Sequence, residues 1–128
     1  MKEPVWIEPR VVIALHERLL AEHGGAQGIR DEGLLDSALA RPRQLFSYEK
    51  PGLPDLAAAY VSGIVQNHTF VDGNKRTAFM TGYVFLGRNR LFLDAREPEA
   101  ATMVFDLAAG TLPESDFAAW LRTHVKRN

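Results

Sequence analysis

The residues best suited to chemistry lie together between positions 68 and 76, in the run His-Thr-Phe-Val-Asp-Gly-Asn-Lys-Arg. Within this run, His68 is the side chain that can accept a proton near neutral pH. Asp72 supplies a hard oxygen ligand of the kind that Mg²⁺ prefers. A proton acceptor beside a metal ligand suits phosphoryl transfer, which depends mostly on positioning and charge neutralisation.

The second half of the same run has the features of an anion site. Gly73 allows the backbone to approach a ligand closely or to adopt a positive φ angle. Asn74 is expected to open a helix whose first N–H groups are free to bind an anion. Lys75 and Arg76 add positive charge where phosphate oxygens would lie. Phe70 is expected to point the other way and anchor the loop to the core.

A purely structural interpretation of these residues is the main alternative. A histidine beside an apolar helix is more often a satisfied structural residue, and Asp-Gly-Asn is a common turn. A turn alone, however, does not require two adjacent cations at the start of a buried helix, so the joint pattern favours a functional site. The other three histidines lack metal-ligand spacing, and His16 is expected to be a packed or capping residue.

The spacing of apolar residues predicts an all-α fold. These residues recur at helical intervals, and alternation never persists long enough for a long strand. We expect about six helices, over residues 9–23, 31–42, 55–67, 74–87, 98–109 and 113–126, with a short extended link at 91–93. The helix over 74–87 is apolar nearly all round and is therefore expected inside the domain.

Local signals predict where some of these helices begin and end. Asp31 is expected to cap the second helix, and Pro42 is expected to end it. Capping boxes are expected at two later helix starts, from the pairs Asp94 with Glu97 and Thr111 with Glu114.

The segment 41–54 is rich in proline and basic residues and is expected to be an ordered loop or a short flap hairpin. Such a flap could hold a target segment by strand-like pairing. Equally, it could be a loop packed on the core through Leu45 and Phe46. Arg41 and Arg43 could bind phosphate or contact a partner, and the sequence leaves this open.

Length and composition point to one soluble domain spanning 1–128. The formal net charge of -1 gives no global field to attract nucleic acid or an anionic membrane, so neither partner is expected. The chain has no cysteine, which excludes disulfides and thiolate chemistry. With no apolar run near the ~18 residues of a membrane span, we expect a cytoplasmic protein.

The run at 68–76 resembles the Fic-family signature, His-x-Phe-x-Asp/Glu-Gly-Asn-Gly/Lys-Arg, at every position of its core. Thr77 and Ala78 follow it and make the chain similar to the Doc (death-on-curing) branch of that family. Weaker similarities to Doc chains occur elsewhere, at residues 15–19, 24–25, 34–42 and 107–110. The resemblance therefore covers nearly the whole sequence.

This resemblance implies the Fic fold, a compact helical bundle in which the motif loop joins two central helices. It also implies ATP and Mg²⁺ as cofactors. The implied residue roles are a general base at His68, a Mg²⁺ ligand at Asp72, an anion-binding turn at Gly73 and Asn74, and nucleotide-phosphate binding at Lys75 and Arg76.

Two departures from the larger Fic family bear on the reaction. Most Fic proteins that transfer AMP have glycine where this chain has Lys75, and they have a second arginine where Phe79 stands. Doc proteins share both departures. The resemblance therefore implies a toxin that transfers the terminal phosphoryl group of ATP to a threonine of elongation factor Tu and blocks translation. An AMP transferase is the first alternative, and a non-enzymatic module that binds a partner is the second.

The resemblance also bears on regulation. Fic proteins are often inhibited by a helix with the pattern Ser/Thr-x-x-x-Glu-Gly/Asn, and we find no such run in this sequence. Restraint is then expected from another protein. For a Doc-like toxin the implied partner is a Phd-like antitoxin, whose C-terminal segment folds into a groove near the site.

Overall fold

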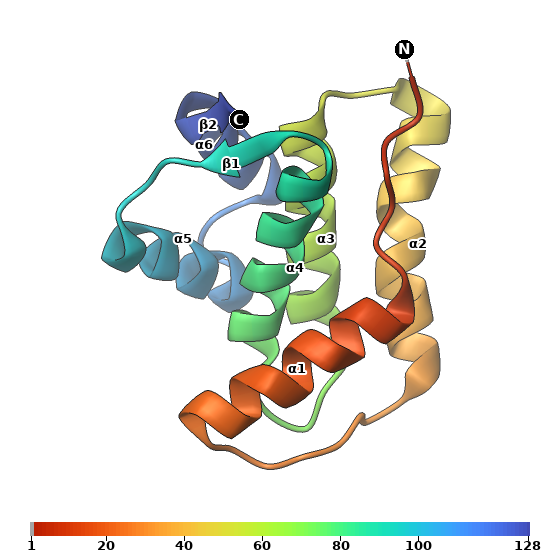
Figure 1. Ribbon diagram of the computed structural model, residues 1–128, viewed down its shortest axis with the longest axis vertical. Helices are drawn as coiled ribbons and strands as arrows, with labels where there is room; N and C mark the ends of the chain where they lie inside the picture. The colour runs from red at the N-terminus through yellow and green to blue at the C-terminus, as the bar shows by residue number, and fades with distance from the viewer. Residues whose placement is uncertain (1) are drawn as a thin grey trace.

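The computed structural model describes residues 2–128 and confirms the all-α prediction (Figure 1). In this part of the chain there are six helices and one small two-stranded sheet. The helices are α1 (Pro9–His23), α2 (Glu32–Glu49), α3 (Leu53–Asn67), α4 (Asn74–Arg88), α5 (Glu97–Ala109) and α6 (Glu114–His124), and the strands are β1 (Leu91–Leu93) and β2 (Val125–Arg127). Among these helices, none is both long and apolar enough to cross a membrane.

Helix α3 lies at the centre of the bundle. Every residue from Leu56 to Val65 is buried, and α3 packs against α2, α4 and α6 (Figure 1). Small residues allow this close packing: a Cβ atom at Gly63 would lie only 3.1 Å from the carbonyl oxygen of Ala38 on α2. Helix α4 is buried on one side, but Tyr83 on its other side is 43% exposed. The most enclosed helix is therefore α3, whereas the sequence indicated 74–87.

The prediction that Pro42 ends the second helix was wrong. Helix α2 continues to Glu49 with Pro42 buried inside it, so residues 41–49 form neither a loop nor a flap hairpin. A proline within a helix removes one backbone hydrogen bond. Tertiary contacts beyond the proline outweigh that loss, because Leu45 and Phe46 pack on the core and the Phe46 ring lies 5.7 Å from the Trp6 ring.

The one short sheet forms elsewhere, where β1 pairs with β2 in antiparallel register, Leu91 opposite Arg127. The last helix consequently ends at His124 instead of continuing to Lys126. Residues 125–127 are extended because they provide the only partner strand for β1 within residues 2–128. The extended link that the sequence indicated at 91–93 is thus confirmed as a strand.

The helix starts follow the local signals only in part. The Asp31 carboxylate accepts a hydrogen bond from the N–H of Gly33 at 2.7 Å, which confirms it as the cap of α2. Both expected capping boxes were wrong, because α5 and α6 begin without a side-chain cap. Thr111 instead donates its hydroxyl to the carbonyl of Asp106, and the N–H of Asp94 extends the small sheet by donating to His124.

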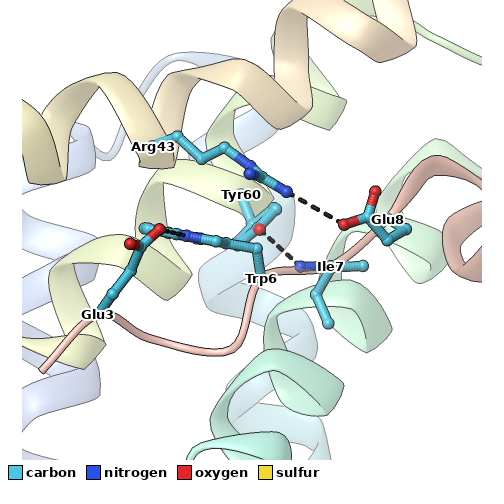
Figure 2. A network of polar contacts seen from close by, with 6 residues as sticks. All are labelled: Glu3, Trp6, Ile7, Glu8, Arg43 and Tyr60. Atoms are coloured by element: carbon cyan, nitrogen blue, oxygen red, sulfur yellow. Dashed lines mark hydrogen bonds and ion pairs between the residues drawn. The ribbon is translucent and has the colours of Figure 1, made fainter.

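The N-terminal segment runs alongside α2 (Figure 1) and is held by a polar network (Figure 2). The N–H of Ile7 donates to the buried Tyr60 hydroxyl at 2.9 Å. Arg43 forms an ion pair of 3.1 Å with Glu8 and lies over the Trp6 ring (Figure 2). Arg43 of α2 and Tyr60 of α3 therefore hold residues 6–8 to the bundle.

Arg41 is also engaged within the fold. Its guanidinium donates to the carbonyl oxygen of Ala59 at 3.2 Å and pairs with Glu114 at 2.9 Å. It therefore ties α2 to α3 and α6. Both arginines of this segment make structural ion pairs, and neither lines the cavities described below.

The close contact of α3 with α4 gives a stability test at Gly82. A methyl group there would lie 2.7 Å from Cγ2 of Val61, a buried side chain with little rotational freedom. Overpacking costs about 1–3 kcal/mol, more than the roughly 0.8–1 kcal/mol that alanine gains over glycine in a helix. We expect Gly82→Ala to lower the free energy of unfolding measured in urea.

Gly87 in the same helix is the matched control. Apart from the neighbouring backbone of α4 itself, no atom of residues 2–128 lies within 4 Å of a methyl group placed there, so Gly87→Ala should be neutral or stabilising by up to about 1 kcal/mol. Stabilisation by both substitutions would contradict the packing described for α3 and α4.

Candidate functional site

The motif loop joins the C-terminus of α3 to the N-terminus of α4, at the end of the bundle that α1 crosses (Figure 1). His68 ends α3 in the left-handed conformation, with φ 48° and ψ 54°. Gly73 precedes α4 with φ 78°, which glycine adopts without strain. Left-handed geometry is uncommon for residues other than glycine, and surrounding contacts maintain it at His68.

Phe70 anchors the loop to the core, as the sequence indicated. Its ring is 0% exposed and stacks on His16 of α1, with centroids 3.8 Å apart and planes 10° from parallel. The Asn74 side chain closes the loop from the other end: its Oδ1 accepts from the Phe70 N–H at 2.8 Å, and its Nδ2 donates to the Phe70 carbonyl at 2.9 Å. The Asn74 amide thus shapes the loop, and its backbone N–H is left for a ligand.

The segment between α1 and α2 runs along the motif loop and braces it. Ile29 and Phe70 form an antiparallel bridge, with the Val71 N–H donating to the Gly28 carbonyl at 3.0 Å. Arg30 donates its N–H to the Thr69 carbonyl and its guanidinium to the His68 carbonyl, both at 3.0 Å. Both carbonyls follow the Cα atom of His68, so Arg30 holds the backbone on the C-terminal side of the imidazole, and α3 holds it on the other side. A strand-like pairing within the protein thus forms beside the motif loop, whereas residues 41–49, where the sequence allowed a flap hairpin, are helical.

The Asp72 carboxylate belongs to the same brace. Its Oδ2 accepts from the N–H of Ala26 at 3.2 Å, and its Oδ1 accepts from the N–H of Gly73 at 2.8 Å. These two N–H groups lower the pKa of Asp72 from its usual 3.8, and the charge of Arg76 lowers the pKa further. The side chain is exposed and ionised near neutral pH, so it can present oxygen lone pairs to a cation.

The loop and the first turn of α4 line one hollow of about 380 Å³. Five of the six predicted site residues meet there: His68, Asp72, Gly73, Asn74 and Lys75. His68 is exposed to this space. Within residues 2–128, the first backbone N–H group of α4 that has an acceptor is that of Thr77, which donates to Gly73 at 3.0 Å. The three earlier N–H groups are free to bind an anion.

Arg76 lies outside this hollow, on a larger groove of about 650 Å³ between α1, α4 and α5. Lys75 lines both spaces, and its ammonium lies 5.9 Å from the centroid of the Phe105 ring. The groove has an apolar floor and charged side chains at its rim, Arg18 and Glu22 among them. Both cations therefore line the groove, and only Lys75 also lines the hollow.

Comparison with known proteins identifies the family. A family model described as Fic/DOC matches residues 6–86, which include α1 to α3, the motif loop and most of α4. The chain belongs to the Fic/DOC family. It is 32% identical over 117 residues to "Protein kinase doc" of Escherichia phage P1, covering 91% of this chain and 92% of that protein. It is 45% identical over 74 residues to "Toxin Doc" of Mycolicibacterium smegmatis, covering 56% and 57% of the two chains.

Some residues of this Fic/DOC site were not recognised from the sequence. Arg30 and Ala26 carry no local signal, because their partners lie 38 and 46 positions further along the chain. His16 was expected to be packed or capping, and its burial is confirmed, but its bond to the Asp72 carbonyl was not anticipated. The glycines at 24, 25 and 28 were the one available signal, since all three adopt positive φ in the bracing segment.

The lowered pKa of Asp72 gives a pH-dependent stability difference. Because the folded-state pKa lies below the unfolded value of 3.8, the carboxylate stabilises the fold fully above that value and progressively less as the pH falls through the folded-state pKa. Asp72→Asn keeps only one acceptor oxygen. We expect its Tm to lie below that of the natural protein by a constant margin down to about pH 5, with the margin vanishing in stronger acid.

Circular dichroism melting curves across this pH range measure the difference. Asp36→Asn, at an exposed position on α2, is the control and should change Tm little at any pH. A margin for Asp72→Asn that stays the same in strong acid would contradict the role of the ionised carboxylate.

Proposed function

We propose that this protein is a Doc-type toxin of a toxin-antitoxin system, a protein kinase that transfers the terminal phosphoryl group of ATP to a hydroxyl of another protein. The observation that carries the proposal is the single hollow in which His68, Asp72 and the free N–H groups of α4 meet. A proton acceptor, a carboxylate and an anion site on one small surface are what transfer of a phosphoryl group requires.

His68 would act as the general base. The acceptor oxygen would bond to the terminal phosphorus of ATP as the bond from that phosphorus to the bridging oxygen breaks and ADP leaves, and the hydroxyl proton would pass to the imidazole. The brace supports this role because Arg30 holds the His68 carbonyl and the neighbouring Thr69 carbonyl at 3.0 Å each. Because the end of α3 holds the backbone before His68 and Arg30 holds it after, the imidazole would need little reorganisation before it takes the proton.

The start of α4 would hold the phosphates. The backbone N–H groups of Asn74, Lys75 and Arg76 have no acceptor within residues 2–128, because the first N–H of α4 with an acceptor is that of Thr77. They lie at the N-terminus of the helix, which is the positive end of its dipole. The Lys75 ammonium adds a full charge at the edge of the same hollow. Arg76 would bind phosphate oxygens only from the groove side, where it lies in the structure.

Asp72 would hold Mg²⁺. No group of three or more acidic, histidine or cysteine side chains that could bind a metal occurs in residues 2–128, so at most two such side chains, Asp72 among them, would bind the ion. This fits Mg²⁺, which is commonly bound by one or two carboxylates together with water and substrate phosphates. When bound, the ion would neutralise charge on the phosphate oxygens.

Two further partners complete the proposal. The resemblance to Doc proteins favours a threonine of elongation factor Tu as the acceptor. A Phd-like antitoxin would restrain the toxin by folding a segment into the groove between α1, α4 and α5. The apolar floor of that groove suits an amphipathic helix, and Lys75 and Phe105 would connect such a helix directly to the hollow that contains His68.

The general-base assignment is tested by His68→Ala. Loss of a general base lowers the rate by about 10²–10⁴-fold, so we expect protein phosphorylation and growth arrest to disappear while the fold remains intact. Labelled ATP in a cell lysate reports the transfer, and the intact mass of the acceptor distinguishes a phosphoryl from an adenylyl adduct. His124→Ala, on the remote C-terminal helix, is the matched control and should stay active. A toxic His68→Ala would favour a non-enzymatic binding module.

The choice between phosphoryl and AMP transfer is tested by Lys75→Gly. This change restores the glycine that most AMP-transferring Fic proteins have, and it removes the ammonium from the edge of the hollow. We expect phosphorylation to be lost, with weak AMP transfer emerging, as measured by the mass of the acceptor. Intact phosphorylation by this variant would show that Lys75 does not select the orientation of the phosphates.

A further inference from the structure

We propose that His16 is a positioning residue for this site, and that it acts through the hydrogen bond between its Nε2 and the Asp72 carbonyl oxygen. The proposal rests on the function proposed above. It assigns a role in the reaction to a side chain of α1 that lies 56 positions before Asp72 in the chain.

The environment of His16 is unlike that of the other histidines. It is 3% exposed, and it alone among the four histidines of the chain is buried. Its Nε2 lies 2.8 Å from the Asp72 carbonyl oxygen. A carbonyl oxygen can only accept, so Nε2 must carry the hydrogen and donate it.

The His16 ring contacts the turn at three points. It stacks on Phe70, it bonds to Asp72, and it lies against Gly73, where a Cβ atom would be 3.7 Å from Nε2. The stacking fixes the plane of the ring, because the two planes are only 10° apart. The stacking therefore keeps the Nε2–H group of His16 directed at the Asp72 carbonyl oxygen.

Within residues 2–128, this bond is the only one to the carbonyl oxygen of the peptide between Asp72 and Gly73. Glycine adopts positive and negative φ with similar ease, so without His16 this peptide would be held only by the bond from the Gly73 N–H to the Asp72 side chain. Rotation of this peptide would turn the Gly73 N–H away from the Asp72 carboxylate, to which it now donates at 2.8 Å. It would also redirect the carboxylate and the first N–H groups of α4.

The opposite side of the same residue is held by the bracing segment. Ala26 donates to the Asp72 carboxylate at 3.2 Å, and Gly28 accepts from Val71 at 3.0 Å. The turn is thus fixed from α1 on one side and from residues 26–30 on the other. His16 bonds to the backbone carbonyl of Asp72, whereas Ala26 bonds to its side chain.

Two substitutions separate the donated bond from the packing of the ring. His16→Leu and His16→Gln both remove the stacking on Phe70, and only the glutamine retains an N–H donor near the position of Nε2. We expect kcat for phosphoryl transfer to fall about 10- to 100-fold in His16→Leu, and to recover to within about threefold of the natural protein in His16→Gln. Both variants should lose a similar amount of Tm.

Amide hydrogen exchange provides a readout that does not depend on activity. The N–H groups of Ala26 and Gly73 should exchange faster in His16→Leu than in His16→Gln, because both donate to the Asp72 carboxylate. If the natural protein transfers no phosphoryl group, the proposed function fails, while this exchange pattern still decides whether His16 orders the turn.

Equal kcat and equal exchange in the two variants would overturn the proposal and leave His16 with a packing role. Tyr60→Phe is the matched control, since it removes a buried hydrogen bond, from Ile7 at 2.9 Å, on the N-terminal side of the bundle. It should lower Tm without changing kcat. In the natural protein, ¹⁵N NMR of the imidazole must show the hydrogen on Nε2, and a bare Nε2 would overturn the proposal even if the variants do not fold.

Discussion

The hydrogen bonds that hold residues 68–73 between α3 and α4 are the constraint on which the candidate site depends. A short connection between two helices has backbone groups that no helix satisfies, and here other segments satisfy them. Asn74 pairs with both backbone groups of Phe70, while Arg30 binds the carbonyl oxygens of His68 and Thr69. These contacts maintain the left-handed geometry at His68. This geometry ends α3, and the exposed imidazole lines the hollow.

Burial of α3 provides the rigid support for this loop. A helix that is enclosed from Leu56 to Val65 cannot shift without disturbing α2, α4 and α6 together, so the position of His68 is fixed by the core. Phe70 continues this support into the loop, because its ring is fully buried against α1. The polar atoms of the candidate site are thus exposed, while the core holds the backbone that carries them.

Charge is organised locally in this protein. The net charge of -1 provides no long-range attraction, yet the first turn of α4 gathers two cations, three free N–H groups and the positive end of the helix. Lys75 belongs both to the hollow and to the groove between α1, α4 and α5. A partner bound in the groove would therefore contact a residue of the site, which gives a direct physical route from partner binding to inhibition.

The sequence by itself determined the helical class, the cap at Asp31, the anchoring of Phe70 and the group of residues that lines the hollow, because periodicity, capping and the spacing of a short motif are local properties. Only the tertiary structure decided that α2 continues through Pro42, since that depends on contacts made by residues beyond the proline. It also separated Arg76 from the hollow and joined His16 and Arg30 to the motif loop. His16 lies 56 positions from Asp72, and Arg30 lies 38 positions from His68. A local sequence pattern does not show which distant groups will form hydrogen bonds with a loop's backbone once the helices have packed.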